Sequence, residues 1–279
     1  MLMVQLQVYE DISHFKKDFV PILEMNEQEN NLILGVLHSV ESPQFMAAAK
    51  QNENIVIILL QTEKKQMIVA KSEASKKDIK EIAKQLVKVY PNIPGLIGEK
   101  RVVTQLAEEI AQIEQKKFFI RMNQGIYELK KVKKKWDNHG VFRQIDNGEL
   151  PLIEKWVYQF CEDVYLPTTA EDAKQTAYAL VSTKRLFGLE VDGELVSVAA
   201  ITRPTKSNIT VNFVYTPKEA RKKGYASNCV AALSQYMLDQ GYKTTTLYTD
   251  LANPTSNKIY QEVGYEFIME SVLLFLEPM

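Results

Sequence analysis

The order of predicted helices and strands occurs twice along this 279-residue chain, and this repetition constrains the fold more than any other feature. Hydrophobic periodicity in the first half predicts roughly the order β-α-α-β-β-α-α-β-β. The corresponding segments are residues 4–9, 11–25, 27–40, 55–61, 66–71, 75–89, 100–115, 117–121 and 126–132. The second half repeats that order approximately, with little shared sequence. We therefore expect an internal structural duplication.

The second half contains the clearer local signals. Asp192-Gly193 is a strong two-residue hairpin turn, and Asn253-Pro254 and Gly264 are typical of the start and end of a helix. The predicted segments are residues 143–145, 149–163, 170–183, 186–191, 194–202, 208–215, 225–240, 243–249, 254–263, 265–270 and 271–276.

A lysine-rich stretch separates the two halves. Residues 130–135 read KKVKKK, and a polar, turn-rich sequence follows to residue 140. A basic patch for nucleic acid or an acidic membrane is one interpretation, and a solvated linker or edge strand is the other. The net charge of −1, from 34 basic and 35 acidic residues, favours the linker, because nucleic-acid-binding proteins usually carry a basic excess.

Composition excludes several classes of protein. The apolar share of 46% is enough for a sizeable core. The longest apolar run, residues 55–60, is far shorter than the roughly 20 residues of a membrane helix. The N-terminus lacks the pattern of a signal peptide, and two cysteines, Cys161 and Cys229, are too few for a disulfide framework or a Cys-type zinc site. We expect a cytoplasmic protein that binds no metal, nucleic acid or membrane.

The stretch 214–227 carries the clearest chemistry. A strand ends, a basic loop follows, and an amphipathic helix begins just after Gly224. The first N–H groups of a helix have no partner within it and favour an anion. This pattern predicts a pyrophosphate site, although a tight turn into a surface helix would give a similar sequence. The loop is neither a Walker loop nor a GxGxxG dinucleotide motif.

Two motifs in this half resemble the GNAT N-acetyltransferase superfamily. The first is (Gln/Arg)-x-x-Gly-x-(Gly/Ala), matched at Arg221, Gly224 and Ala226. The second is Asn-x-x-(Ala/Ser)-x-x-(Leu/Ile)-Tyr-x-x-x-Gly-(Phe/Tyr), matched at Asn253, Ser256, Ile259, Tyr260, Gly264 and Tyr265. The resemblance implies an α/β fold of two acetyltransferase-like halves, each a mixed, mostly antiparallel twisted sheet flanked by helices. It implies a degenerate domain over residues 1–135 and an acetyl-CoA-binding N-acetyltransferase domain over 140–279.

The first half departs from the family pattern. Its nearest stretch, residues 94–100, has glycines but no Arg-x-x-Gly-x-Ala, so we expect no CoA site there. In the second half the resemblance implies acetyl-CoA as cosubstrate, in a V-shaped cleft between strands 208–215 and 243–249. The residues implied for binding it are Val214, Tyr215, Arg221, Lys222, Lys223, Gly224, Tyr225, Ala226, Ser227, Asn253 and Asn257.

The resemblance also implies direct acyl transfer to an amine, with Tyr260 as the general acid for the leaving thiolate. The alternative role of Tyr260 is a half-buried core residue. Asn253 could equally be a helix cap. For the general base the candidates are Asp250, Glu190 or a water chain, because strand 208–215 has no carboxylate and Asn212 stands where some relatives carry Glu.

The acceptor is left open by the sequence: a small-molecule amine, a peptide N-terminus or a protein lysine would each serve. A CoA-binding sensor or scaffold without turnover is the rival function, and a generic anion-binding domain is a third. The presence of Tyr260 favours the enzyme.

Overall fold

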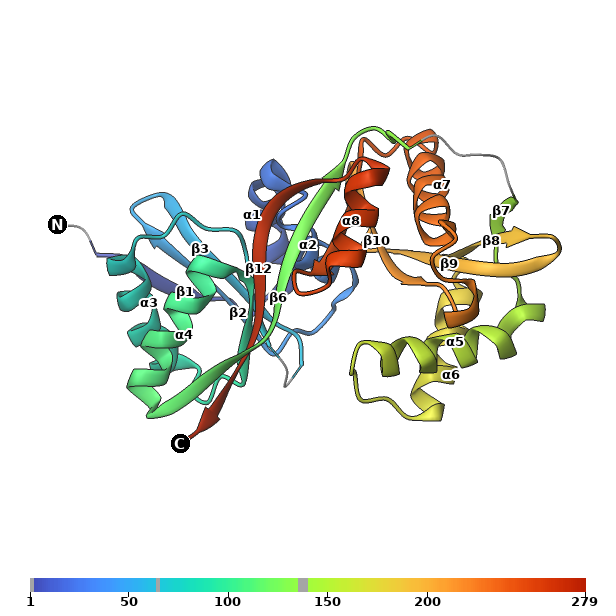
Figure 1. Ribbon diagram of the computed structural model, residues 1–279. Helices are drawn as coiled ribbons and strands as arrows, with labels where there is room; N and C mark the ends of the chain where they lie inside the picture. Colours follow the sequence, from blue (N-terminus) through green and yellow to red (C-terminus); the bar gives the residue numbers. More distant parts are fainter. Residues whose placement is uncertain (1–2, 64–65, 135–139) are drawn as a thin grey trace. The chain divides into compact units, whose positions relative to one another are not determined.

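A computed structural model of the chain describes residues 3–63, 66–134 and 140–279 (Figure 1). The described chain divides into two compact units. The first unit comprises Met1–Tyr127, Tyr248–Asn253 and Phe267–Met279, and the second comprises Glu128–Leu247 and Pro254–Glu266. Residues 135–139 of the predicted linker lie outside the described residues. No helix in the described ranges is long and apolar enough to cross a bilayer.

The described residues of the first half form ten helices and strands in the order β-α-α-β-β-β-α-β-α-β, with a short 3-10 turn at Glu24–Asn26. They are β1 (Gln5–Val8), α1 (Ile12–Leu23), α2 (Asn31–Ser39), β2 (Phe45–Gln51), β3 (Asn54–Gln61), β4 (Met67–Val69), α3 (Lys76–Val89), β5 (Gly95–Glu99), α4 (Lys100–Glu114) and β6 (Lys116–Leu129). In the first unit the strand order is β1-β2-β3-β4-β5-β12, where β12 (Glu266–Pro278) is the last strand of the chain. Only β4 and β5 pair in parallel among these neighbours.

Successive side chains of the central strand β3 belong to two different cores, which explains why helices cover both faces of this sheet. Ile57 and Leu59 of β3 belong to a core with α3 and α4, whereas Ile58 and Leu60 belong to a core with α1 and α2. Successive side chains of a strand point to opposite faces, so an unbroken apolar strand requires helices on both sides.

The second half of the chain supplies the same order again, with 3-10 turns at Asn147–Glu149 and Lys218–Ala220. Its elements are β7 (Val141–Gln144), α5 (Leu150–Asp163), α6 (Ala170–Ser182), β8 (Leu186–Val191), β9 (Glu194–Thr202), β10 (Asn208–Tyr215), α7 (Tyr225–Asp239), β11 (Thr244–Asp250), α8 (Pro254–Val263) and β12. The strand order in the second unit is β7-β8-β9-β10-β11, antiparallel except for the parallel pair β10–β11. Helices α5 and α6 pack on one face, and α7 packs against β8, β9 and β10 from the other.

The predicted duplication and fold class are confirmed. The two halves share the order of their elements and the position of a parallel strand pair, β4–β5 and β10–β11. The hairpin turn is also confirmed, since Asp192 and Gly193 both adopt the positive φ that a type I′ turn requires.

Four details of the prediction were wrong. Strands β2 and β5 were missed, because β2 is rich in alanine and β5 contains two glycines, residues that are depleted in strands. The strands predicted at 117–121 and 126–132 form one strand, β6, and those at 265–270 and 271–276 form one strand, β12.

Candidate functional site

Strand β10 contains an irregularity close to its end. Asn212 pairs with Ala200 of β9, and Tyr215 pairs with Val198, so β10 has one residue more than its partner over this interval. Phe213 within the bulge has a φ of +45°. A bulge places an extra residue outside the regular ladder and bends the strand. Val214 and Tyr215, the predicted backbone donors, lie in this bulged segment.

The parallel register of β10 with β11 runs from Asn208–Thr244 to Val211–Leu247. Strand β10 then continues for four residues to Tyr215. The predicted cleft between these two strands remains a prediction.

The loop after β10 leads into a helix start without a side-chain cap. Gly224 is the N-cap residue of α7, with φ +80° and ψ 0°, and no side chain accepts a hydrogen bond from the first turn there. Lys222 is also left-handed, with a φ of +63°. Lys222, Lys223 and Gly224 are all exposed. A Cβ added to Gly224 would meet no atom within 4 Å, so open space lies beside the backbone at this point. Exposed helical N–H groups beside two lysines suit an anion.

The first turn of α7 is otherwise regular. The Gly224 carbonyl accepts hydrogen bonds from the Asn228 N–H (3.0 Å) and the Ser227 hydroxyl (2.9 Å). Tyr225 and Ala226 are half-buried and Ser227 is buried. The Ser227 hydroxyl therefore stabilises the helix start in the present structure.

The side chain of Arg221 is held by the protein. Its Nε donates to the Thr216 carbonyl (2.9 Å), and its guanidinium pairs with the Asp163 carboxylate and lies over the Tyr215 ring, 5.8 Å from the centroid. Asp163, the last residue of α5, also lies 3.7 Å from the Lys218 amine. Sequence reasoning missed Asp163, because 58 positions separate it from Arg221 and no motif includes it.

Tyr260 lies on α8 in the second unit. Its side chain is half-buried, and burial raises the pKa of its phenol well above the usual value, with the neighbouring Tyr265 adding to the effect. The two rings meet edge to face at 6.1 Å. Among the described residues, none forms a hydrogen bond with the Tyr260 hydroxyl. This phenol is therefore protonated at neutral pH and available to a ligand.

Unlike Tyr260, Tyr265 is fully buried and its hydroxyl has hydrogen-bond partners. Its hydroxyl is hydrogen-bonded to Ser234 (2.9 Å) and Thr245 (2.8 Å), and burial raises its pKa to about 12. Gly264, with φ +119°, ends α8, and the Tyr265 N–H donates to the Tyr260 carbonyl (3.0 Å). The Gly-Tyr pair of the motif thus closes the helix and places a structural phenol next to a free one.

Comparison with protein-family models matches residues 150–265 to the acetyltransferase (GNAT) family. Residues 150–265 therefore match a GNAT domain. The match includes both sequence motifs, from the Arg221 loop to Tyr265. Acetyl transfer that depends on an acyl-CoA is the general activity of this family. A comparison with curated proteins gave no significant match.

Solved structures show the same fold over nearly the whole chain. A GNAT acetyltransferase from Colwellia psychrerythraea is 12% identical, with 99% of this chain and 100% of that chain covered and a TM-score of 0.64. A GCN5-related N-acetyltransferase from Sphaerobacter thermophilus is 10% identical, with 98% and 95% covered and a TM-score of 0.60. A tandem GNAT protein from the clavulanic acid biosynthesis pathway is 9% identical, with 98% of both chains covered and a TM-score of 0.54.

Three further predicted site residues, Asp250, Asn253 and Asn257, lie in or near the second motif. The carboxylate of Asp250 accepts the Ala252 N–H (2.9 Å), and the Asp250 carbonyl accepts the Asn253 N–H (3.0 Å). Both Asp250 and Asn253 belong to the first unit, and they shape the turn between β11 and α8. Asn257 lies on α8 in the second unit.

Glu190, the other candidate base, is part of an ion cluster. Arg143 Nε donates to Glu190 (2.8 Å), and the guanidinium makes two further bonds of 2.8 Å to Glu149. This cluster lowers the pKa of Glu149 and raises that of Arg143. Glu190 therefore has a structural role that ties β8 to β7, which makes it the weaker candidate for a base.

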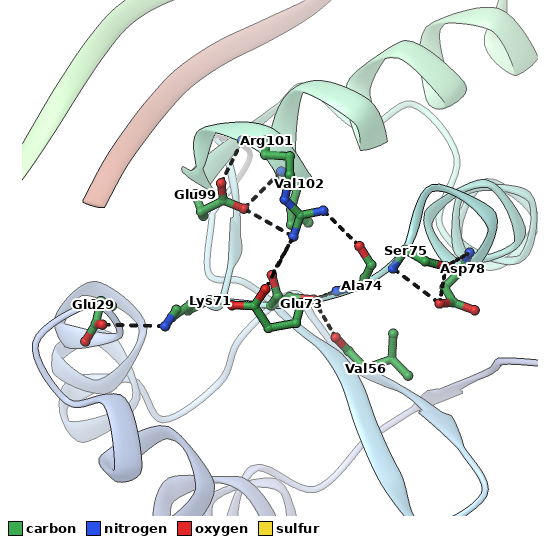
Figure 2. Close-up of polar contacts among 11 residues, drawn as sticks. Glu29, Val56, Lys71, Glu73, Ala74, Ser75, Asp78, Glu99, Arg101 and Val102 are labelled. Atoms are coloured by element: carbon green, nitrogen blue, oxygen red, sulfur yellow. Dashed lines mark hydrogen bonds and ion pairs between the residues drawn. The ribbon is translucent and has the colours of Figure 1, made fainter. Parts of the chain in front are cut away.

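The first unit has a counterpart of the β10–α7 loop, and there the start of the helix is capped by the protein's own side chains (Figure 2). By element order, the β4–α3 loop corresponds to the β10–α7 loop. Residues 94–100, which the sequence analysis took as the nearest stretch, correspond to the β11–α8 region instead. Ser75 caps α3 in a full capping box with Asp78, so a carboxylate and a hydroxyl occupy the helix start.

Hydrogen bonds from Arg101 and a close approach of β5 to β4 also hold the β4–α3 loop in place. Arg101 donates to the carbonyls of Ala74 (2.9 Å) and Ser72 (3.1 Å), as Figure 2 shows for Ala74. A Cβ on Gly98 of β5 would lie 2.4 Å from the Val69 carbonyl of β4, so the two parallel strands approach closely at their ends. The first unit therefore has the repeated fold, but the start of its helix α3 is capped by the protein's own side chains.

Proposed function

We propose that the second half of the chain, residues 140–279, binds acetyl-CoA and transfers the acetyl group directly to an amine. The observation that carries this proposal is the start of α7: a left-handed Gly224 with open space beside it, no side-chain cap, and exposed Lys222 and Lys223. The first unit supports it by contrast. Its helix α3 corresponds to α7 but lacks the GNAT motif, and the start of α3 is capped by side chains.

The residues that would hold acetyl-CoA follow from this arrangement. The first N–H groups of α7, at Tyr225, Ala226 and Ser227, and the two lysines favour the pyrophosphate. Backbone N–H groups of the β10 bulge, at Val214 and Tyr215, favour the pantetheine arm and the thioester oxygen. Bound acetyl-CoA supplies the activated acyl group. Asn253 and Asn257 are the further amide side chains proposed to contact the arm.

The reaction needs a general acid and a general base. Tyr260 is the proposed general acid for the leaving thiolate, because its phenol is protonated and its hydroxyl has no bond to another described residue. An amine acceptor must lose a proton, and Asp250 or a water molecule is the proposed route. The acceptor is a small-molecule or peptide amine.

Calorimetric titration with acetyl-CoA tests the binding site. Gly224→Glu places a carboxylate in the open space at the start of α7, so we expect binding to be lost in a folded protein. Gly193→Glu is the matched control: Gly193 has a φ of +81°, nearly the same as Gly224, and also has no atom within 4 Å of an added Cβ. It lies in the β8–β9 turn and should leave affinity unchanged. Equal affinity in the wild type and the Gly224 variant would refute this site.

A further inference from the structure

Helix α5 contacts the strand–loop segment before α7 with two polar side chains one helical turn apart. Gln159 accepts a hydrogen bond from the Tyr215 hydroxyl (2.9 Å), and Asp163 pairs with Arg221 and Lys218. Residues four apart lie on the same face of a helix. One face of α5 therefore holds both the end of β10 and the loop that follows it.

The side chain of Arg221 closes this loop on itself. Its Nε bonds to the Thr216 carbonyl, five residues earlier, while its guanidinium meets Asp163. Thr216 is in turn fixed to the sheet, because its hydroxyl lies 2.9 Å from the hydroxyl of Ser197 on β9. The segment 216–221 is thus anchored to β9 and to α5 before the chain enters the left-handed residues Lys222 and Gly224.

We propose that Asp163 is a positioning residue for acyl-CoA recognition. It holds the Arg221 side chain folded back, so that Lys222, Lys223 and the backbone at the start of α7 present the anion site, and Arg221 orders the loop. This inference rests on the proposed function. It assigns the arginine of the GNAT motif a role in loop geometry, where the sequence analysis placed it among the residues that bind the cosubstrate.

Arg221 could bind the anion directly or order the loop. These two roles predict opposite changes in acetyl-CoA affinity when Asp163 is removed. Asp163 is a negative charge close to a proposed anion site, so removing it should tighten acetyl-CoA binding if charge alone matters. Removal also frees Arg221 to reach the anion. If Asp163 positions the loop, the same change must weaken binding instead.

The decisive variant is Asp163→Asn, titrated with acetyl-CoA by calorimetry. We expect about fivefold weaker binding, the size of one partly exposed ion pair. The KM for acetyl-CoA should rise by the same factor, with kcat unchanged. Glu162→Gln is the control, because it removes the same charge from the adjacent exposed residue. In an Arg221→Gln background the Asp163 change should have no further effect. Unchanged or tighter binding by Asp163→Asn would overturn the proposal.

A ligand-free measurement separates this inference from the proposed function. Trypsin cleaves after arginine and lysine, and residues 221–223 supply three such sites in the exposed loop. We expect faster cleavage there in Asp163→Asn than in the wild type or Glu162→Gln, without any ligand. Wild-type protein that binds no acetyl-CoA would refute the proposed function and the binding role together. Normal wild-type binding with equal cleavage and affinity in Asp163→Asn would refute the positioning role alone.

Discussion

Two neighbouring tyrosines provide a matched pair for separating catalysis from stability. Tyr260 and Tyr265 are in edge-to-face contact, and in each case substitution by Phe removes one hydroxyl and little volume. The Tyr260 hydroxyl has no hydrogen-bond partner among the described residues, whereas Tyr265 is bonded to Ser234 and Thr245. The two substitutions should therefore have opposite consequences.

The expected magnitudes follow from those contacts. Tyr265→Phe removes two buried hydrogen bonds, each worth about 1 kcal/mol net, and so should lower the free energy of unfolding by about 2 kcal/mol. At about 2–4 °C per kcal/mol, the melting temperature should fall by about 4–8 °C. Tyr260→Phe breaks no such bond and should melt like the wild type. Its turnover should fall by about 10²–10⁴-fold, as is usual for the loss of a general acid.

Both quantities can be measured on the same preparations, by thermal unfolding and by thiol release from acetyl-CoA. The rate deficit of Tyr260→Phe should shrink at high pH, because the thiolate then leaves without a proton. Tyr265→Phe should keep its rate per folded molecule. A Tyr260→Phe variant that melts lower but keeps its rate would show that Tyr260 is a core residue and that the catalytic assignment is wrong.

Three further outcomes are expected. Calorimetry should give one acetyl-CoA per chain, because the start of α3 is closed by its capping box; two equivalents would contradict this. Gly98→Ala should destabilise the protein by more than about 2 kcal/mol in urea, since its Cβ would lie 2.4 Å from the Val69 carbonyl, while Gly193→Ala has open space and should cost only about 1 kcal/mol, from its left-handed φ of +81°. Arg143 lowers the pKa of Glu149 below its ordinary 4.5, so this pair stabilises the fold above that pH and loses its effect as pH falls through the lowered value. The gap in melting temperature between wild type and Arg143→Met should therefore narrow from pH 7 to pH 3, and a constant gap would contradict the assignment.

Local patterns in the sequence were sufficient to predict most of the fold. The helices α3, α5 and α7 follow from 3.6-residue periodicity, and the Asp192-Gly193 turn follows from the φ angles that it requires. Strand β2 was missed because three consecutive alanines favour a helix in isolation, and only its pairing between β1 and β3 makes it a strand.

Local patterns do not predict which strands pair when they are far apart in the sequence. Strand β12 pairs with β5, more than 170 residues earlier in the chain, and no local signal indicates that partner. The loop that leads into α7 could be predicted, because its glycine, charges and helix start are consecutive. The side-chain contacts of Arg221 could not, because its partner Asp163 lies at the end of a helix that is distant in sequence. Likewise, only the contacts of their hydroxyls distinguish Tyr260 from Tyr265.

The central claim is acetyl transfer to an amine by the second half of the chain, and amine-dependent thiol release from acetyl-CoA tests it most directly. Wild-type protein and Gly193→Glu should release free CoA thiol only when both acetyl-CoA and a suitable amine from a panel of small-molecule and peptide acceptors are present. Gly224→Glu should release none. Wild-type protein that binds acetyl-CoA yet releases no thiol with any amine of the panel would contradict the enzyme and favour a CoA-binding sensor or scaffold.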